Sequence, residues 1–358
     1  MKNTIKYLLE NGCSSIKYRV RHEILGESKD SEVLKALKIN ILDEDIVKHI
    51  ISVQKEDGWI SNRFHTAQTG TSDAAEPLMR LLCEKGLDTK DTVLKRALKI
   101  MEKEDQHFIS YLDDHCERNY SEIDHSGLGG PLLIRATLFA QAGLECLEFV
   151  ERETKKAIDV FNYVLKIKSF NEIIEVRRGK YVFKEGIKWP SLYHMRLLAY
   201  STRWKTEENL NLVSDAFKNL IRILPFNDNI YFKDSKSQLV TPYGQILDAL
   251  DTQFFELEND NWCTWFHRLE LVSRMGIVNK VPVFKDMVIH LKSMIRENEG
   301  LFIEKAPRKS FFRWNAYSGL ALEENWKNKS RRISDLTFRS LLILHYSKMD
   351  DSYRKIYD

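Results

Sequence analysis

Long apolar runs are absent from this sequence. The apolar run within residues 1–10 is too short for a signal peptide, and no later segment approaches about 18 uninterrupted apolar residues, the length expected of a membrane-spanning helix. We therefore expect no stable membrane insertion and a cytoplasmic location.

Cysteine is also sparse and has no informative spacing. The five cysteines are scattered, odd in number and without a C-x-x-C pair, which argues against a disulfide framework and against a thiolate zinc site. No spacing of histidines and acids is diagnostic of a metal either, so the sequence predicts no metal site and leaves the cofactor unknown.

No block of one charge occurs. Lys and Arg total 55 against 52 Asp and Glu, and the formal net charge of +3 is spread along the chain. A nucleic-acid-binding surface gathers positive charge, so we expect no nucleic-acid partner. The composition, 43% hydrophobic and 30% charged, is typical of a globular protein with a sizeable core and gives no information on oligomeric state.

Glycine and proline are scarce, at 15 and 7 of 358 residues, and the segments between them carry apolar residues at helical spacing. Two kinds of helix alternate. Helices with one apolar face start near Asp43, Asp91, Glu151, Thr206 and Val281, with Asp43 and Thr206 as expected N-caps. Helices that are apolar nearly all round are expected at residues 74–82, 131–142, 192–200, 262–272 and 336–344.

This alternation predicts outer helices paired with buried inner ones. Residues 43–347 would form five helical hairpins, and the N-terminal helices within residues 1–40, at 3–10 and 14–25, can supply a sixth. We predict an all-α fold, an α/α toroid of five to six hairpins, as a single domain over residues 1–358. An open superhelix would show the same stripes and stays an alternative.

One turn carries a family resemblance. Gln54, Gly58 and Trp59, in Val53-Gln54-Lys55-Glu56-Asp57-Gly58-Trp59-Ile60, resemble the Q-x-x-x-G-x-W turn of terpenoid cyclases, a family that includes squalene-hopene cyclases and protein prenyltransferase β subunits. Weaker copies lie at residues 296–302 and 178–183. The resemblance implies an α/α toroid in which the turn is structural, and it suggests an isoprenoid-like substrate.

The catalytic motifs of that family are not reproduced. The nearest match to its Asp-x-Asp-Asp is Tyr111-Leu112-Asp113-Asp114, which lacks the first aspartate, and the Asp, Cys and His zinc ligands of the prenyltransferases have no assignable counterparts. The activity of the family is therefore not transferred to this chain.

A polar segment at residues 104–125 is the first candidate for chemistry. Asp113, Asp114 and His115 are the candidate acid–base catalysts, and the glycines of residues 126–131 can bring backbone N–H groups to a helix N-terminus. The alternative is a solvated loop rich in acids.

Aromatic and histidine side chains recur where three inner helices begin. If these ends converge, they would line a common pocket; otherwise the same rings cap the core. The candidate pocket residues are Trp189, Tyr193, His194, Trp262, Trp265, His267 and Trp314.

Charged residues on the apolar inner helices form a third pattern. Because a buried charge is costly unless it is paired, they predict either a ring of ion pairs or an anionic ligand. Asp335 and Arg339 have the i,i+4 spacing of a helical pair. The full set is Arg135, Arg196, Arg268, Glu270, Asp335 and Arg339.

These patterns favour a toroid enzyme whose aromatic central cavity binds a small, isoprenoid-like or otherwise largely apolar molecule. A carbohydrate-active hydrolase or lyase on the same fold is one alternative, and a non-catalytic binding or scaffold toroid is another. The sequence leaves open whether the chain is an enzyme. These three functions would be distinguished by which polar side chains meet at the centre of the fold.

Overall fold

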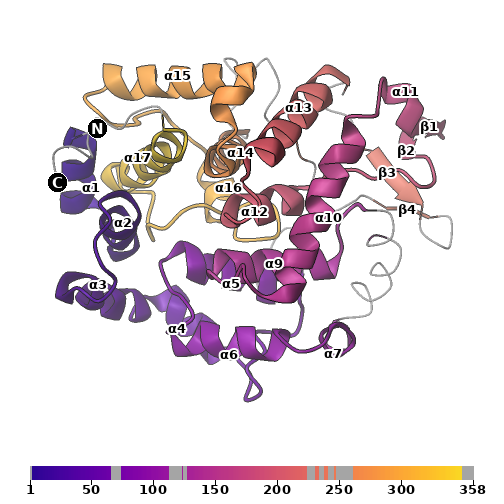
Figure 1. Cartoon of the computed structure of the whole chain (residues 1–358). Helices are drawn as coiled ribbons and strands as arrows, with labels where there is room; N and C mark the ends of the chain where they lie inside the picture. Colours follow the sequence, from indigo (N-terminus) through magenta and orange to yellow (C-terminus); the bar gives the residue numbers. More distant parts are fainter. Residues whose placement is uncertain are drawn as a thin grey trace.

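The computed structural model describes residues 2–65, 74–112, 123, 127–223, 230–233, 238–240, 246 and 261–348. It is mostly helical, as predicted (Figure 1). The five expected inner helices are present, and four of them differ from their expected bounds at one or both ends. They are α5 (Ala75–Glu84), α9 (Pro131–Gln141), α12 (Leu192–Tyr200), α14 (Trp262–Met275) and α17 (Lys329–Tyr346).

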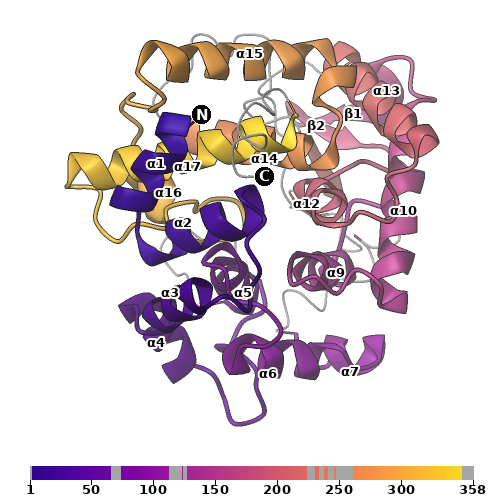
Figure 2. The same ribbon diagram turned by 60° about the vertical axis from the view of Figure 1, so that its left-hand side comes forward.

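The expected one-sided helices are α4 (Asp45–Ser52), α6 (Thr92–Met101), α10 (Glu148–Val164), α13 (Glu207–Ile223) and α15 (Pro282–Glu297). In Figure 2, α6, α10, α13 and α15 lie at the periphery and α5, α9, α12 and α14 lie inside them. The outer and inner roles read from the apolar stripes are thus correct for these pairs.

The two predicted N-caps have different outcomes. The Thr206 hydroxyl accepts a hydrogen bond from the Asn209 N–H at 3.2 Å at the start of α13, as expected. The Asp43 prediction is wrong, because Asp43 is the C-cap of an additional helix, α3 (Glu32–Leu42), which Ser31 caps at its start. The apolar stripe at residues 42–51 therefore spans a break between two helices.

The N-terminal segment packs against the last helix. It forms α1 (Lys2–Asn11), α2 (Ser14–Arg19) and the π-helical turn η1 (Val20–Ile24), and both α1 and α2 contact α17. The inner helices contact one another in chain order, α5 with α9, α9 with α12, α12 with α14 and α14 with α17.

A small sheet was not expected from the sequence. Its strands, in the order β1-β2-β3-β4, are β1 (Ile174–Arg177), β2 (Lys180–Phe183), β3 (Ile230–Lys233) and β4 (Leu239–Val240); β2 and β3 are parallel and the other pairs antiparallel. Arg178 and Gly179 both have positive φ in the β1–β2 hairpin. The weak turn copy at residues 178–183 is therefore a β-hairpin and not a helix–helix turn.

The remaining short elements connect these layers. They are α7 (Asp105–Ile109), α11 (Phe170–Ile173), the 3-10 turn η4 (Val278–Lys280) and α16 (Arg308–Phe312). Within the described ranges, no helix combines the length and apolarity needed to cross a membrane.

The Gln54 turn is structural, as the sequence indicated. The Gln54 amide donates to the carbonyls of Gly58 at 2.8 Å and Val93 at 2.9 Å, which ties the end of α4 to the start of α6. Gly58 has φ +104°, and a Cβ there would lie 2.7 Å from the Arg96 carbonyl oxygen. Trp59 is buried and its ring stacks on Tyr111.

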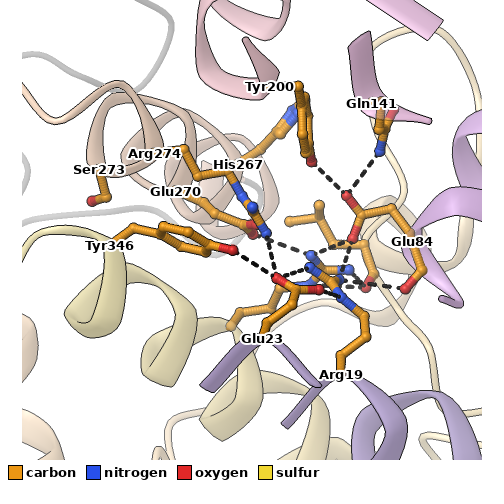
Figure 3. A network of polar contacts seen from close by, with 12 residues as sticks. Arg19, Glu23, Glu84, Gln141, Tyr200, His267, Glu270, Ser273, Arg274 and Tyr346 are labelled. Carbon is orange, nitrogen blue, oxygen red and sulfur yellow. Dashed lines mark hydrogen bonds and ion pairs between the residues drawn. The ribbon is translucent and has the colours of Figure 1, made fainter. Parts of the chain in front are cut away.

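Six charged side chains from four parts of the chain, five of them buried and Glu23 partly exposed, form a closed ring of ion pairs, which we call the arginine–glutamate ring (Figure 3). In order around the ring, they are Arg19, Glu84, Arg339, Glu270, Arg274 and Glu23, and each residue pairs with the next, Glu23 with Arg19 included. The distances from Arg19 to Glu84, Glu84 to Arg339 and Arg339 to Glu270 are 2.7, 2.8 and 3.1 Å.

Neutral side chains complete the hydrogen bonding of the ring. Glu84 also accepts from the Tyr200 hydroxyl at 2.9 Å, and Glu23 from the Tyr346 hydroxyl at 2.9 Å. Burial raises the pKa of Glu23, but Arg19 and Arg274 outweigh it and lower the pKa to about 2. With three arginines and three glutamates the ring is neutral, and it joins α2 and η1 to α5, α14 and α17.

The predicted pair of Asp335 and Arg339 is not formed. Asp335 instead accepts hydrogen bonds from the backbone N–H groups of Leu322 and Glu323 and from the Trp326 indole. Arg339 faces the ring. The i,i+4 spacing brings two side chains near each other but does not outweigh better partners on other segments.

Replacing Glu84 tests the ring. The change Glu84→Gln keeps the shape but leaves Arg19 and Arg339 sharing two carboxylates with Arg274. We expect the free energy of unfolding, measured by urea denaturation, to fall by about 3 kcal/mol, because breaking a buried ion pair leaves uncompensated charge.

The exposed Glu10, 4.0 Å from Lys6, provides the matched control. Glu10→Gln should change the free energy of unfolding by less than about 0.5 kcal/mol. Equal effects of the two changes would show that the ring contributes nothing to stability.

Candidate functional site

A second buried polar group differs from the ring, because its two arginines share a single glutamate among the described residues. We call it the His65 cluster, and it consists of His65, Glu76, Arg80, Tyr193, Arg196, His267 and Tyr317. Six of these side chains are buried and Tyr317 is partly exposed.

The start of α5 places His65 beside Glu76. The first N–H groups of a helix have no partner within the helix. Here the N–H of Ala75 donates to the Arg63 carbonyl at 2.8 Å and that of Glu76 to the Phe64 carbonyl at 2.9 Å. These bonds hold residues 63–65 against α5, and the His65 Nδ1 lies 3.6 Å from a Glu76 carboxylate oxygen.

Two tyrosine hydroxyls approach the His65 ring. Tyr193, on α12, lies 3.3 Å from His65 Nδ1, and Tyr317 lies 3.5 Å from His65 Nε2. Both rings meet the imidazole edge to face, with ring centroids 5.9 Å apart. A histidine between a carboxylate and two hydroxyls has the partners needed to accept and to return a proton.

Arg196 connects this histidine to the next inner helix. It lies one turn after Tyr193 on α12, and its guanidinium is 3.2 Å from Glu76 and 5.0 Å from the centre of the Tyr193 ring. Its Nε also lies 3.5 Å from His267 Nε2, on α14. Burial lowers the pKa of His267 well below its usual value, and the charge of Arg196 adds to this effect, so His267 is neutral.

Arg80 holds the loop that carries Tyr317. Its guanidinium donates to the carbonyls of Asn315, Ser318 and Gly319 and lies over the Trp314 ring, 4.7 Å from its centre. The Asn315 side chain accepts from the N–H groups of Tyr317 and Ser318, which tightens the turn. Arg80 thereby positions Tyr317 against His65.

The electrostatics of the cluster follow from burial with few counter-charges. Burial would raise the pKa of Glu76, but hydrogen bonding to His65 and the charge of Arg196 bring it below its usual value. Burial lowers the pKa of Arg80 to about 10, and the charge of Arg196 contributes in the same direction. Tyr193 has a raised pKa, first from burial and then from Glu76.

Three of the seven predicted pocket residues meet in this region. Tyr193 and His267 belong to the cluster, and Trp314 lies beneath Arg80. Trp314 contributes to packing and not to the hydrogen-bond network.

The other four predicted pocket residues have structural contacts elsewhere. Trp189 packs on Phe183 of β2, and Trp262 and Trp265 pack on each other and on Phe266. His194 caps α12, since its Nδ1 accepts from the Ser191 N–H at 2.9 Å. Their role in lining a pocket stays a prediction.

The predicted acid–base residues Asp113, Asp114 and His115 lie outside the described residues. Their assignment stays a prediction.

Sequence reasoning missed His65, Glu76 and Arg80. The usable signal was Glu76 and Arg80, spaced i,i+4 in the otherwise apolar stretch Ala74-Ala75-Glu76-Pro77-Leu78-Met79-Arg80. His65 gave no local signal, because only the backbone bonds to α5 bring it to the cluster.

A cavity of about 220 Å³ adjoins the arginine–glutamate ring, lined in part by Glu23, Glu84, Tyr200 and Arg274. Their charges already pair within the ring. This cavity therefore offers less unsatisfied binding capacity than the His65 cluster.

No protein-family model matches the sequence, and neither the curated proteins nor the solved structures give a match.

His194 provides a test of local electrostatics. Burial lowers its pKa to about 3, so the unfolded chain takes up a proton below about pH 6.5 that the folded chain cannot. Stability from His194 is present above that pH and is lost as the pH falls. His194→Asn keeps an acceptor for the Ser191 N–H but does not titrate.

We expect the stability advantage of the wild type over His194→Asn to shrink by about 2 kcal/mol between about pH 7.5 and about pH 5, measured by urea denaturation. His267 is present in both proteins, so its contribution to the pH dependence cancels in the difference between them. A difference that stays constant with pH would contradict the prediction.

Proposed function

We propose that this chain is a single-domain α/α toroid that acts on a carbohydrate by general acid–base chemistry, as a hydrolase or lyase, with His65 as the proton-transferring residue. The observation that carries the proposal is the position of His65 between the Tyr193 and Tyr317 hydroxyls, with Glu76 3.6 Å away.

Three observations support closure of the toroid. The inner helices contact one another in chain order, and the last of them, α17, contacts α1 and α2. Arg19 of α2 then pairs with Glu84 of α5 at 2.7 Å. The contacts therefore return to the first inner helix after the last, which an open superhelix would not require.

The polarity of the His65 cluster favours a carbohydrate over an apolar substrate. An isoprenoid cavity would be lined by apolar and aromatic side chains, whereas here a carboxylate, two guanidiniums, two imidazoles and two phenols gather. The tryptophans expected to line an apolar cavity, Trp262 and Trp265, pack against phenylalanines instead.

The His65 cluster lowers the stability of the fold, and this favours a functional role over a purely structural one. Arg80 Nε and Arg196 Nη2 are buried without a hydrogen-bond partner among the residues that the structure describes. Each such group destabilises the fold by about 1–3 kcal/mol. Unpaired polar groups and shifted pKa values gather at functional sites more often than in scaffolds.

Replacing His65 tests the catalytic role. In His65→Asn, the side chain cannot transfer a proton at neutral pH. We expect release of reducing ends from a panel of neutral and acidic polysaccharides to fall by about 10²- to 10⁴-fold in kcat.

His49 on the exposed face of α4 gives the control, and His49→Asn should retain the wild-type rate. Circular dichroism should show the same helix content in all three proteins. Absence of turnover on every polysaccharide, or an unchanged rate in His65→Asn, would overturn the proposed function in favour of a binding or scaffold protein.

A further inference from the structure

We propose that the substrate of the His65 cluster carries a negatively charged group, a carboxylate or a phosphate, which Arg80 and Arg196 recognise. This inference rests on the proposed function and narrows its substrate class. It starts from a difference in charge between the two buried polar groups of the molecule.

The arginine–glutamate ring shows how this fold pairs buried arginines. Each of its three guanidiniums contacts carboxylates at 3.2 Å or less, and each carboxylate contacts two arginines. Full pairing is the expected state of a buried charge that serves stability.

The His65 cluster departs from that arrangement. Arg196 shares Glu76 with His65, and Arg80 donates hydrogen bonds only to neutral carbonyls among the residues that the structure describes. In that same part of the chain, no carboxylate lies within 4.0 Å of the Arg80 guanidinium. Among the residues that the structure describes, two guanidiniums thus face one carboxylate.

Hydrogen-bonding capacity is also left over. Within the described part of the chain, Arg80 Nε and Arg196 Nη2 have no acceptor although both side chains are at least 97% buried, with exposures of 3% and 1%. An anion would supply both negative charge and hydrogen-bond acceptors to these guanidiniums, whereas an uncharged sugar would supply acceptors without the charge.

The N-terminal ends of two helices also favour an anion at the cluster. Glu76 and Tyr193 are the second residues of α5 and α12, so the cluster lies at two helix N-termini, where the partial positive charge of the backbone favours an anion. Glu76 offsets one of these charges. Tyr317 is the one residue of the cluster that is partly exposed.

The first experiment uses the wild-type protein and matched ligands. Isothermal titration calorimetry at constant ionic strength would compare D-glucuronate with its uncharged methyl ester and with D-glucose 6-phosphate. We expect at least one charged sugar to bind with a Kd about tenfold or more below that of the ester, since a charge-assisted bond to a buried guanidinium contributes more than a neutral one. The two charged ligands distinguish a carboxylate from a phosphate.

The second experiment removes one positive charge. Arg196→Gln should weaken binding of the preferred charged sugar by about tenfold or more, while Arg196→Lys, which keeps the charge, should lose less. Arg222→Gln, on the exposed face of α13, is the control and should bind as the wild type does. Circular dichroism establishes that each variant is folded.

The outcomes separate this inference from the proposed function. The inference of an anionic substrate is overturned if the methyl ester and both charged sugars bind equally well, or if neither charged sugar binds. This holds even if polysaccharide turnover depends on His65. Anion-dependent binding with turnover that does not depend on His65 supports the anion site and overturns the catalytic proposal. If Arg196→Gln does not fold, the wild-type comparison still decides.

Discussion

Buried charge is the constraint on which this structure depends. Arginines on the inner helices cannot be solvated there, so each must meet carboxylates or carbonyls from other segments. The arginine–glutamate ring meets that requirement by joining residues 19 and 23, 84, 270 and 274, and 339. The packing of α2, α5, α14 and α17 around a common point follows from this pairing as much as from apolar contact.

The same requirement divides the interior into two regions of different chemistry. At the ring, acids and bases are equal in number, and two of the carboxylates accept further hydrogen bonds from tyrosines. At the His65 cluster, guanidiniums are held in place by loop carbonyls and by one shared glutamate. Full pairing suits a structural joint, and incomplete pairing suits a site that a ligand completes.

The sequence predicted the helices better than the polar contacts, for a physical reason. Apolar periodicity is local, so it located the inner helices and the Thr206 cap, and the Gln54 turn was recognisable from adjacent residues. Charge pairing is not local. Arg339 lies four residues from Asp335 but pairs with Glu84 and Glu270, and His65 meets Tyr193 from 128 residues away. The strands at residues 174–183 were not predicted, because the prediction of secondary structure relied on the helical spacing of apolar residues.

The ring also has a consequence for how the chain folds during synthesis. Arg19 can pair with Glu23 as soon as α2 and η1 form, but Arg339 is added 320 residues after Arg19, and until then Glu84 lacks one of its two guanidiniums. Because contacts between such distant segments slow folding, the ring is expected to close only after α17 has been synthesised. A ribosome-bound fragment that ends just before α17 would carry helices α1 to α16 with an acidic imbalance at their centre.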